Sequence, residues 1–379
     1  MNNQELNSRT MKVAKRFRLS GSDNGGKIDP DFRAGQSTGS CGRRDGPYGY
    51  ALSIIWLALA VGFLLIPGAA RAQEHVFQNI AVPNDTFTQL LGINDADVIA
   101  GYHGDGIINP NRGFTLTLPN NFTSENFPGS AQTQVIGINN AGDTGGFYID
   151  SVGTNHGFLR TNGVFSTVDF PGTTFNQILG LNNTGQAAGY FQADSSNQTA
   201  YIFNPFLPPG GQFTNLNPLL ADLLPPGPPI SAQATDINDK GQVSGFYATT
   251  GGGDNGFLLN AGKLTILSFP GAMVTEALGL NNLGQVVGTY TDTQGFMHGF
   301  IYSGGVFETV DDPGAADTTI NGINNFGHIV GFALESNGDT VGFVGSPLVV
   351  PEPSLLSLLA LGSTSLIGMC ILRSRRSLR

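Results

Sequence analysis

The stretch Leu278-Gly-Leu-Asn-Asn-Leu-Gly-Gln-Val-Val-Gly-Thr-Tyr290 is the clearest of six copies of one short pattern in this chain. The other copies begin at Leu91, Ile136, Leu179, Thr235 and Asn321, and their central Asn residues are spaced by 45, 43, 56, 43 and 43 residues. In each copy a Gly or its stand-in closes a tight turn, and a short apolar strand follows. Repetition at this period predicts an array of equivalent units rather than two unrelated domains.

The segments between the copies also repeat. A strand containing Gly-Phe is followed by a hairpin turn such as Asn162-Gly163, and then by a strand that ends in Pro-Gly. Gly-bearing pairs supply the positive φ that two-residue hairpins need, and proline ends a strand because it cannot donate to the ladder. Each repeat therefore offers four short strands, which we number first to fourth. Four strands in about 43 residues predict an all-β fold, a six-bladed β-propeller of four-stranded blades spanning residues 73–349.

The two ends of the array predict how the ring closes. After the sixth copy one more strand follows, Thr340-Val-Gly-Phe-Val344, but no fourth strand. The segment His75-Val-Phe-Gln-Asn-Ile-Ala-Val-Pro-Asn84 resembles a fourth strand without its repeat. We expect this N-terminal strand to complete the last blade and to remove a free sheet edge. A Pro-rich insertion after the third copy predicts a surface excursion with a helical turn at Pro218–Leu224, serving either as a plain loop or as a docking lip.

Composition narrows the function classes. Charged residues make up only 12% of the 379 residues and glycines number 54, which suits short strands and tight turns. Residues 73–350 carry 4 Lys/Arg against 22 Asp/Glu, so this acidic region should repel nucleic acid. The two cysteines, Cys41 and Cys370, lie in the terminal segments, so the middle cannot form an internal disulfide.

The N-terminal segment predicts export. Residues 1–50 are basic, polar and Gly/Ser-rich, and we expect disorder there. An apolar run from Ala51 to Ile66 and the small residues Ala70 and Ala72 predict a signal peptide cleaved after Ala72. The alternative is a retained membrane anchor. The first predicted segment is therefore 1–72, a basic leader plus signal peptide.

The C-terminal segment, 350–379, combines Pro351-Glu352-Pro353, an apolar stretch at 355–372 and a terminal cluster of arginines. The apolar stretch predicts a transmembrane helix with a cytoplasmic C-terminus. Together these features resemble the PEP-CTERM sorting signal of Gram-negative bacteria. That resemblance implies an exosortase-like partner that cuts near the motif, an inner-membrane-tethered precursor, and final placement at the cell surface or in the exopolysaccharide matrix. A plain membrane anchor is the alternative.

Residues 75–345 resemble extracellular HAF-type repeat proteins. The residues that carry this resemblance are His156-Gly-Phe-Leu159, His298-Gly-Phe-Ile301 and the neighbouring Gly-Leu-Asn-Asn-x-Gly-Gln. The third and sixth copies depart from the His-x-Phe element. The resemblance implies secretion and a β-rich repeat fold, and it implies no reaction.

Two sets of repeated polar residues are candidate sites. The central Asn residues are explained by turn chemistry, because an Asn side chain bonds its own backbone in an Asn-x-x-Gly turn. Five residues earlier, near the start of each first strand, polar side chains should form a ring at one mouth of a central channel. The Gln side chains in this set have both donor and acceptor groups, which suit either sugar hydroxyls or ordered water at strand ends. We define this set as the mouth ring, and it consists of Gln89, Gln134, Gln177, Gln233, Glu276 and Thr319.

The loop acids, the histidines and the absence of known motifs do not indicate a catalytic site. Six loop acids could hold Ca²⁺, but they are single and widely spaced, which is typical of solvated loop residues: Asp105, Asp150, Asp194, Asp254, Asp292 and Asp339. His156 and His298 occupy one repeat position and are expected to be structural. No paired cysteines, Gly-x-Ser-x-Gly or phosphate loop occurs, so we expect no metal, cofactor or catalytic set.

The sequence thus predicts an exported, non-enzymatic propeller that binds glycan or a surface protein, or serves as a spacer. The alternative is a polysaccharide hydrolase or lyase with Glu276 in its channel. A channel lined by Gln and Thr would favour binding, and converging acids, His and Arg would favour the enzyme.

Overall fold

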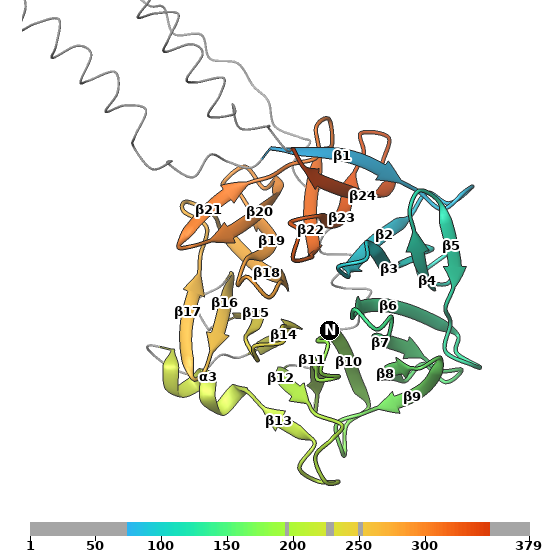
Figure 1. Ribbon diagram of the computed structural model, residues 1–379, viewed down its shortest axis with the longest axis vertical. Helices are drawn as coiled ribbons and strands as arrows, with labels where there is room; N and C mark the ends of the chain where they lie inside the picture. Colours follow the sequence, from blue (N-terminus) through green and yellow to red (C-terminus); the bar gives the residue numbers. More distant parts are fainter. Residues whose placement is uncertain (1–73, 194–196, 225–230, 249–252, 349–379) are drawn as a thin grey trace, which may run out of the picture.

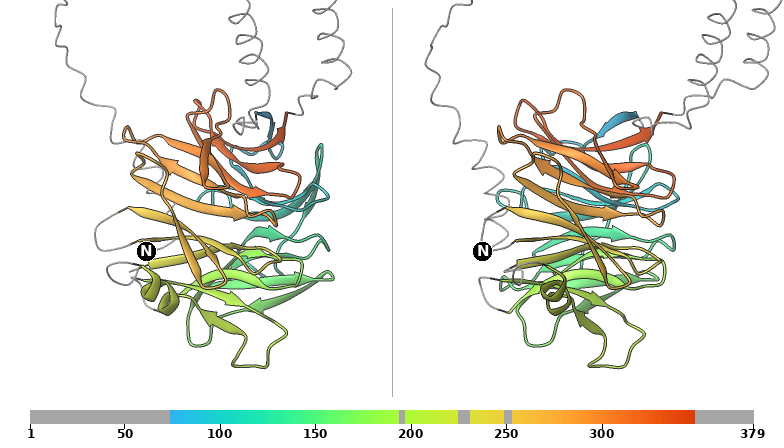
Figure 2. Two further views of the ribbon diagram at one scale, coloured as in Figure 1. Left: turned by 60° about the vertical axis from the view of Figure 1, so that its left-hand side comes forward. Right: turned by 90° about the vertical axis from the view of Figure 1, so that its left-hand side faces the viewer.

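The computed structural model describes residues 74–193, 197–224, 231–248 and 253–348. These residues form an all-β propeller, in which sheets are arranged around a central axis with their innermost strands facing it (Figure 1). Figure 2 shows the same ring from the side. The predicted leader and signal peptide, with Ala70 and Ala72, lie outside the described residues. So do the sorting motif at Pro351, Glu352 and Pro353 and the apolar stretch 355–372.

Four sheets have four strands each. One contains β2 (Thr88–Ile93), β3 (Val98–His103), β4 (Arg112–Thr117) and β5 (Asn121–Ser124). Another contains β14 (Ser231–Ile237), β15 (Val243–Ala248), β16 (Asp254–Asn260) and β17 (Lys263–Leu267). The next contains β18 (Val274–Leu280), β19 (Val286–Thr291), β20 (Met297–Ser303) and β21 (Val306–Thr309). The sheet at the seam contains β22 (Asp317–Ile323), β23 (Ile329–Leu334), β24 (Thr340–Pro347) and β1 (His75–Ile80).

The second and third repeats share one eight-stranded sheet instead of forming separate ones. Its strands are β6 (Gln132–Ile138), β7 (Thr144–Ile149), β8 (Asn155–Thr161), β9 (Val164–Val168), β10 (Phe175–Leu181), β11 (Ala187–Gln192), β12 (Gln198–Phe203) and β13 (Phe213–Asn215). The two sets of four antiparallel strands are joined where β10 and β8 pair in parallel at Phe175 and Asn155. The prediction of separate four-stranded blades therefore holds for four sheets and needs correction here, because the backbones meet at this joint.

The predicted closure by the N-terminal strand is confirmed. Strand β1 pairs antiparallel with β24 along its whole length, from His75 opposite Pro347 to Ile80 opposite Gly342. Phe77 also packs edge-on against Phe343, with ring centroids 5.2 Å apart. The outer edge of the last sheet is therefore supplied by the chain segment that precedes the first repeat.

The Gly-Phe pattern reflects packing within each sheet. The aromatic residue of every third strand is buried, with at most 2% of its surface exposed: Phe114, Phe158, Tyr201, Phe257, Phe300 and Phe343. Each lies opposite a glycine of the second strand, as Phe300 lies opposite Gly288. A Cβ at Gly288 would collide with the carbonyl oxygen of Glu276 and the ring of Phe300, so only glycine allows this approach.

The innermost strands also approach one another closely. Each first strand has a register shift at the same position, as the fourth and fifth repeats show between Ala234 and Asp236 and between Ala277 and Gly279. A Cβ at Gly279 would collide with the carbonyl of Asn321 in the next repeat. These small residues and bulges let the strands converge on the central axis.

The predicted helical turn is helix α3 (Asn217–Leu223). Leu220 is fully buried and packs with Leu216 and Leu224 in a core cluster that includes Phe257 and Leu259 of the next sheet. This part of the insertion therefore packs against the neighbouring sheet. No helix in the described part of the chain is long and apolar enough to cross a membrane.

Candidate functional site

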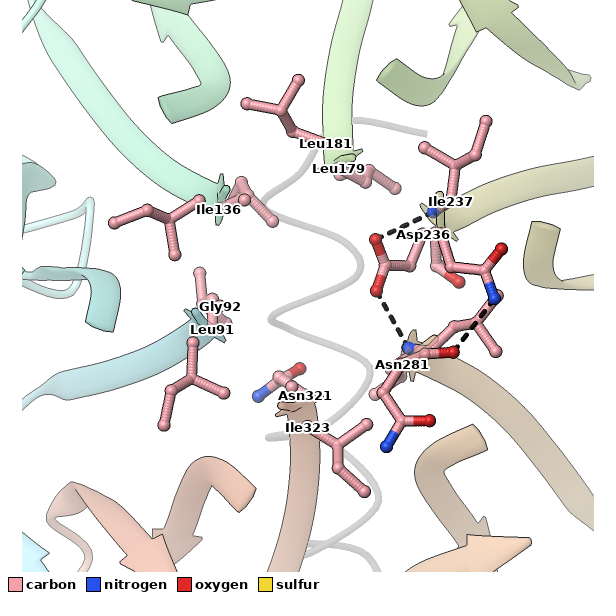
Figure 3. A pocket seen from close by; sticks show the side chains of 18 of the residues that line it. Leu91, Gly92, Ile136, Leu179, Leu181, Asp236, Ile237, Asn281, Asn321 and Ile323 are labelled. Atoms are coloured by element: carbon pink, nitrogen blue, oxygen red, sulfur yellow. Dashed lines mark hydrogen bonds between the residues drawn. The ribbon is translucent and has the colours of Figure 1, made fainter. Parts of the chain in front are cut away.

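The first strands surround a central channel with a volume of about 350 Å³ (Figure 3). This lies within the range of roughly 300–1,000 Å³ that is typical of small-molecule pockets. The middle of the channel is mostly apolar, since side chains such as Leu91, Ile136 and Leu179 line it. Polar residues occupy both ends, and all six repeats contribute to the lining.

The structure brings the predicted mouth ring together. All six of its residues line the channel: Gln89, Gln134, Gln177, Gln233, Glu276 and Thr319. Several already have protein partners. Nε2 of Gln134 donates to Oδ1 of Asn111, and Nε2 of Gln233 donates to Oε1 of Gln198, each at 2.8 Å. These partners lie at or just before the start of the third strand of the preceding repeat, and no pattern in the sequence marks them.

A second set of channel residues is also absent from the sequence-based prediction. The position after the glycine of each second strand places an aromatic side chain in the channel lining in five repeats. We call this set the aromatic collar, and it consists of Tyr102, Phe147, Tyr190, Phe246 and Phe332, with Thr289 at the sixth position. Burial raises the pKa of the Tyr102 and Tyr190 hydroxyls, so both stay neutral. The Tyr102 hydroxyl donates to Oε1 of Gln89 at 2.7 Å.

Glu276 has a partner that the sequence does not reveal. Asp254, expected to be a solvated loop acid, instead begins strand β16 and hydrogen-bonds the Glu276 side chain. At three of the other joints between neighbouring repeats, two amide side chains occupy the place of this acid pair. Burial raises the pKa of Glu276, and the charge and hydrogen bond of Asp254 raise it further. The two carboxyl groups therefore share a proton over a range of pH in which isolated acids would be ionised.

Asp236 is the one acid in the middle of the channel in the described part of the chain, where the other copies have glycine (Figure 3). One carboxylate oxygen accepts the N–H of Ile237 at 2.8 Å, and the other accepts the N–H of Leu280 in the next repeat at 2.9 Å. Burial raises the pKa of Asp236 to about 7, although both N–H donors favour its charged form. Asp236 thus links two adjacent first strands.

The central Asn residues do form turns, as predicted. In the fifth copy, Oδ1 of Asn281 accepts the N–H groups of Leu283 and Gln285, each at 3.0 Å. The central Asn residues also link neighbouring repeats, which the sequence does not reveal. Each Nδ2 donates to the backbone carbonyl of the equivalent Asn in the next repeat, and the last donates to the first. We call this the Asn circle: Asn94 to Asn139 (3.0 Å), Asn139 to Asn182 (3.3 Å), Asn182 to Asn238 (3.1 Å), Asn238 to Asn281 (3.0 Å), Asn281 to Asn324 (3.0 Å) and Asn324 to Asn94 (3.1 Å).

A second closed circle runs beside the first. The backbone N–H that follows each central Asn donates to the side-chain oxygen of the equivalent residue in the next repeat, as Asn325 donates to Asp95 at 2.9 Å. The central Asn residues and the residues that follow them therefore hold the repeats together at their end of the channel. This leaves the opposite end, with the mouth ring and the aromatic collar, as the candidate site.

The histidines are structural, as expected. His298 stacks on Tyr290, and its Nδ1 lies 2.8 Å from a carboxylate oxygen of Asp311. His156 makes the equivalent contacts with Tyr148 and Asp169. Burial alone would lower the pKa of His298, but hydrogen bonds and charges from Asp311 and Asp292 outweigh it and raise the pKa.

The loop acids are used mainly by their own loops. Oδ1 of Asp105 accepts three backbone N–H groups, and Asp150 and Asp292 accept two each. Asp339 pairs with Asn337, and Asp194 lies outside the described residues. Among the residues that are described, no group of three or more His, Cys, Asp or Glu could hold a metal ion.

No protein-family model matches this sequence, and no curated protein matches it significantly. Solved propellers resemble it at a distance. The fucose-specific lectin from Aleuria aurantia is 12% identical with a TM-score of 0.40, covering 74% of this chain and 97% of the lectin. TolB from Acinetobacter baumannii is 11% identical with a TM-score of 0.39, covering 79% and 69%. Trypanosoma rangeli sialidase is 10% identical with a TM-score of 0.39, covering 77% and 58%. These likenesses are too distant to carry a ligand or a reaction to this chain.

Proposed function

We propose that this protein is a non-enzymatic binding propeller that takes a neutral glycan at the mouth of its channel. The observation that carries this proposal is the pairing of the mouth ring with the aromatic collar. Amides offer both donors and acceptors to hydroxyl groups, and aromatic rings offer apolar surface to the carbon face of a sugar. Such a mixture of apolar walls and few placed polar groups is what ligand pockets require.

The charge of the channel supports a neutral ligand. Among the described lining residues there is no His, Lys or Arg, while Asp95, Asp236, Asp239 and Glu276 are acids. An anionic polysaccharide would meet no cation here, and the acids that are ionised would repel it. The lining also lacks the convergence of acids with His and Arg that we expected to favour a hydrolase or lyase.

The proposed location follows from the two chain ends. We infer export after cleavage at Ala70-Arg-Ala72, and then processing by an exosortase-like enzyme near Pro351-Glu352-Pro353. The protein would then reach the cell surface or exopolysaccharide matrix of a Gram-negative bacterium. Mass spectrometry of the secreted protein tests both cleavages. Recovery of a chain that keeps residues 1–72 or 355–372 would contradict them.

We also propose that the ring works as six equivalent blades, with the eight-stranded sheet counted as two. The six-membered Asn circle supports this count, because the joint between Asn139 and Asn182 is bonded like the others. So does the single pair, Phe175 with Asn155, through which the two halves of that sheet meet. Each blade would then contribute one residue to the mouth ring.

The binding proposal is tested with the protein secreted from its full-length reading frame. Immobilised cellulose, starch and mannan serve as neutral polysaccharides, and alginate serves as an acidic control. We expect retention on at least one neutral polymer and none on alginate, with no effect of EDTA, since binding through amides and aromatic rings needs no metal. Absence of retention on every neutral polymer overturns the proposal.

A second function is supported by the acid pair. A proton shared between Glu276 and Asp254 could be donated to a leaving group, which would make the channel a polysaccharide hydrolase or lyase. Release of new reducing ends from a retained polysaccharide tests this alternative. Activity that disappears in Glu276→Gln would establish it and would refute the non-enzymatic proposal.

A further inference from the structure

The mouth ring is not uniform, and one of its joints is left open. Gln177 and Asn155 belong to the joint between the second and third repeats. They occupy the same repeat positions as Gln134 and Asn111 at the preceding joint, where the two amides bond directly at 2.8 Å. At the following joint, Gln233 and Gln198 bond at the same distance.

At the open joint, both polar atoms lack a partner. Nε2 of Gln177 and Oδ1 of Asn155 are buried and make no hydrogen bond in the described part of the chain. The two residues are only 4% and 5% exposed. Buried polar groups in native proteins are almost always paired, because leaving one unpaired is costly. One atom is a donor and the other an acceptor, and the equivalent amides bond each other at the two neighbouring joints, so a hydroxyl group that reaches both atoms can satisfy both.

The surroundings of Asn111 and Asn155 differ. Asn111 is held toward Gln134 by two bonds, in which its Nδ2 donates to the carbonyl of Gly104 and its backbone N–H donates to the Gln132 side chain. Asn155 is instead fixed through its backbone, because it pairs with Phe175 where the two halves of the eight-stranded sheet merge.

Gln177 also lies beside the aromatic collar. It lines the channel, and it is directly opposite Tyr190 in the pairing of β10 with β11. Phe147 of the preceding repeat lines the same channel. A ligand whose hydroxyl reaches Gln177 would therefore place its carbon skeleton near Tyr190, in a channel that Phe147 also lines.

We propose that Gln177 and Asn155 form the subsite that holds one hydroxyl group of a neutral pyranoside at the channel mouth. This proposal rests on the glycan-binding function above, and it identifies where in the ring the sugar is held. The hydroxyl accepts from Nε2 of Gln177 and donates to Oδ1 of Asn155. In the absence of sugar, a water molecule would meet the same two atoms.

The test uses the full-length protein and the methyl α-glycosides of glucose, galactose, mannose and N-acetylglucosamine as probes. The side-chain amide resonances of Gln177, identified by their loss in Gln177→Met, should shift on addition of at least one glycoside. Affinity for that glycoside should fall about tenfold in Gln177→Met and in Asn155→Leu, as expected for loss of one buried hydrogen bond. Gln177→Glu keeps the shape but removes the donor, and it should lose a similar factor.

Gln285→Met is the matched control, because Gln285 bonds Asn281 at the opposite end of the channel. Its affinity should stay within about twofold of the parent protein, which is well below the effect of one lost hydrogen bond. Equal affinity for the glycoside in the parent, Gln177→Met and Gln177→Glu would overturn the subsite. So would the absence of any shift in the Gln177 amide resonances with all four glycosides. If neutral polysaccharide is still retained in that case, only the subsite fails. If neither polysaccharide nor glycoside binds, the glycan-binding function fails as well.

Discussion

Asn281→Ala should destabilise the protein strongly, because it breaks the Asn circle. The Asn281 residue is 3% exposed, and its side chain makes four hydrogen bonds. It accepts from the N–H groups of Leu283 and Gln285, and it donates to the Asn324 carbonyl at 3.0 Å and to the Gln285 side chain at 2.7 Å. At roughly 0.5–1.5 kcal/mol net for each bond, the sum is about 2–6 kcal/mol. Leu283 is exposed, so water can replace one partner, and we expect about 2–3 kcal/mol.

Asn282→Ala is the control from the neighbouring circle. Its side chain makes two hydrogen bonds to Asp239 of the preceding repeat, but both of these bonds are exposed to solvent. We expect a loss of about 1 kcal/mol or less. Urea denaturation of the full-length protein, followed by far-UV circular dichroism, gives both free energies of unfolding. If Asn281→Ala costs no more than Asn282→Ala, the Asn circle does not hold the repeats together.

Three further predictions concern the acid pair, the structural histidines and the close glycines. Because the native pKa of Glu276 is raised above 4.5, the native state holds more protons than the unfolded state between that value and the native pKa, and stability falls as pH rises through that window. Glu276→Gln should therefore become more stable relative to the parent protein as pH rises from 5 toward 8. The gain should be at most about 1.4 kcal/mol for each pH unit. A difference in urea midpoints that does not change with pH would contradict this prediction. The raised pKa of His298 gives a contribution that is complete below 6.5 and is lost as pH rises through the native pKa; His298→Gln should cost more at pH 6 than at pH 9 in thermal unfolding. Gly288→Ala should cost about 1–3 kcal/mol or more by overpacking. Gly211→Ala should be close to neutral, because its Cβ would meet only the Pro208 carbonyl oxygen at 3.5 Å, an ordinary contact distance. Equal melting temperatures for the two variants would be inconsistent with the packing described.

The predictable part of the fold is the part that local chemistry determines. The Asn-x-x-Gly turns, the strand after each turn and the stop at Pro-Gly all follow from the conformational limits of three residue types. Ring closure is also predictable, since one strand is missing at the end of the array and one is left over at its start. The merging of the second and third repeats into one sheet is not, because a single backbone pairing between Phe175 and Asn155 leaves no pattern in the sequence.

The candidate site is predictable by position but not by partners. Counting five residues back from each central Asn finds the mouth ring, because equivalent repeat positions meet around one axis. The aromatic collar can be found in the same way, at the residue after each second-strand glycine, but it varies between Tyr, Phe and Thr and so does not stand out. The prediction of Asp254 as a loop acid is wrong because β16 begins at that residue, two positions before the recognisable Gly256-Phe257.

The most direct test of glycan binding at the channel mouth is hydrogen–deuterium exchange of the full-length protein, with and without a neutral polysaccharide that retains it. Binding at the mouth should slow exchange in peptides that contain the starts of the first strands, above all around Gln134 and Gln177, and in the second-strand residues beside Phe147 and Tyr190. Exchange in the outer strands β5, β9 and β17 should not change. Protection confined to those outer strands, with none at the mouth, would contradict the proposed site.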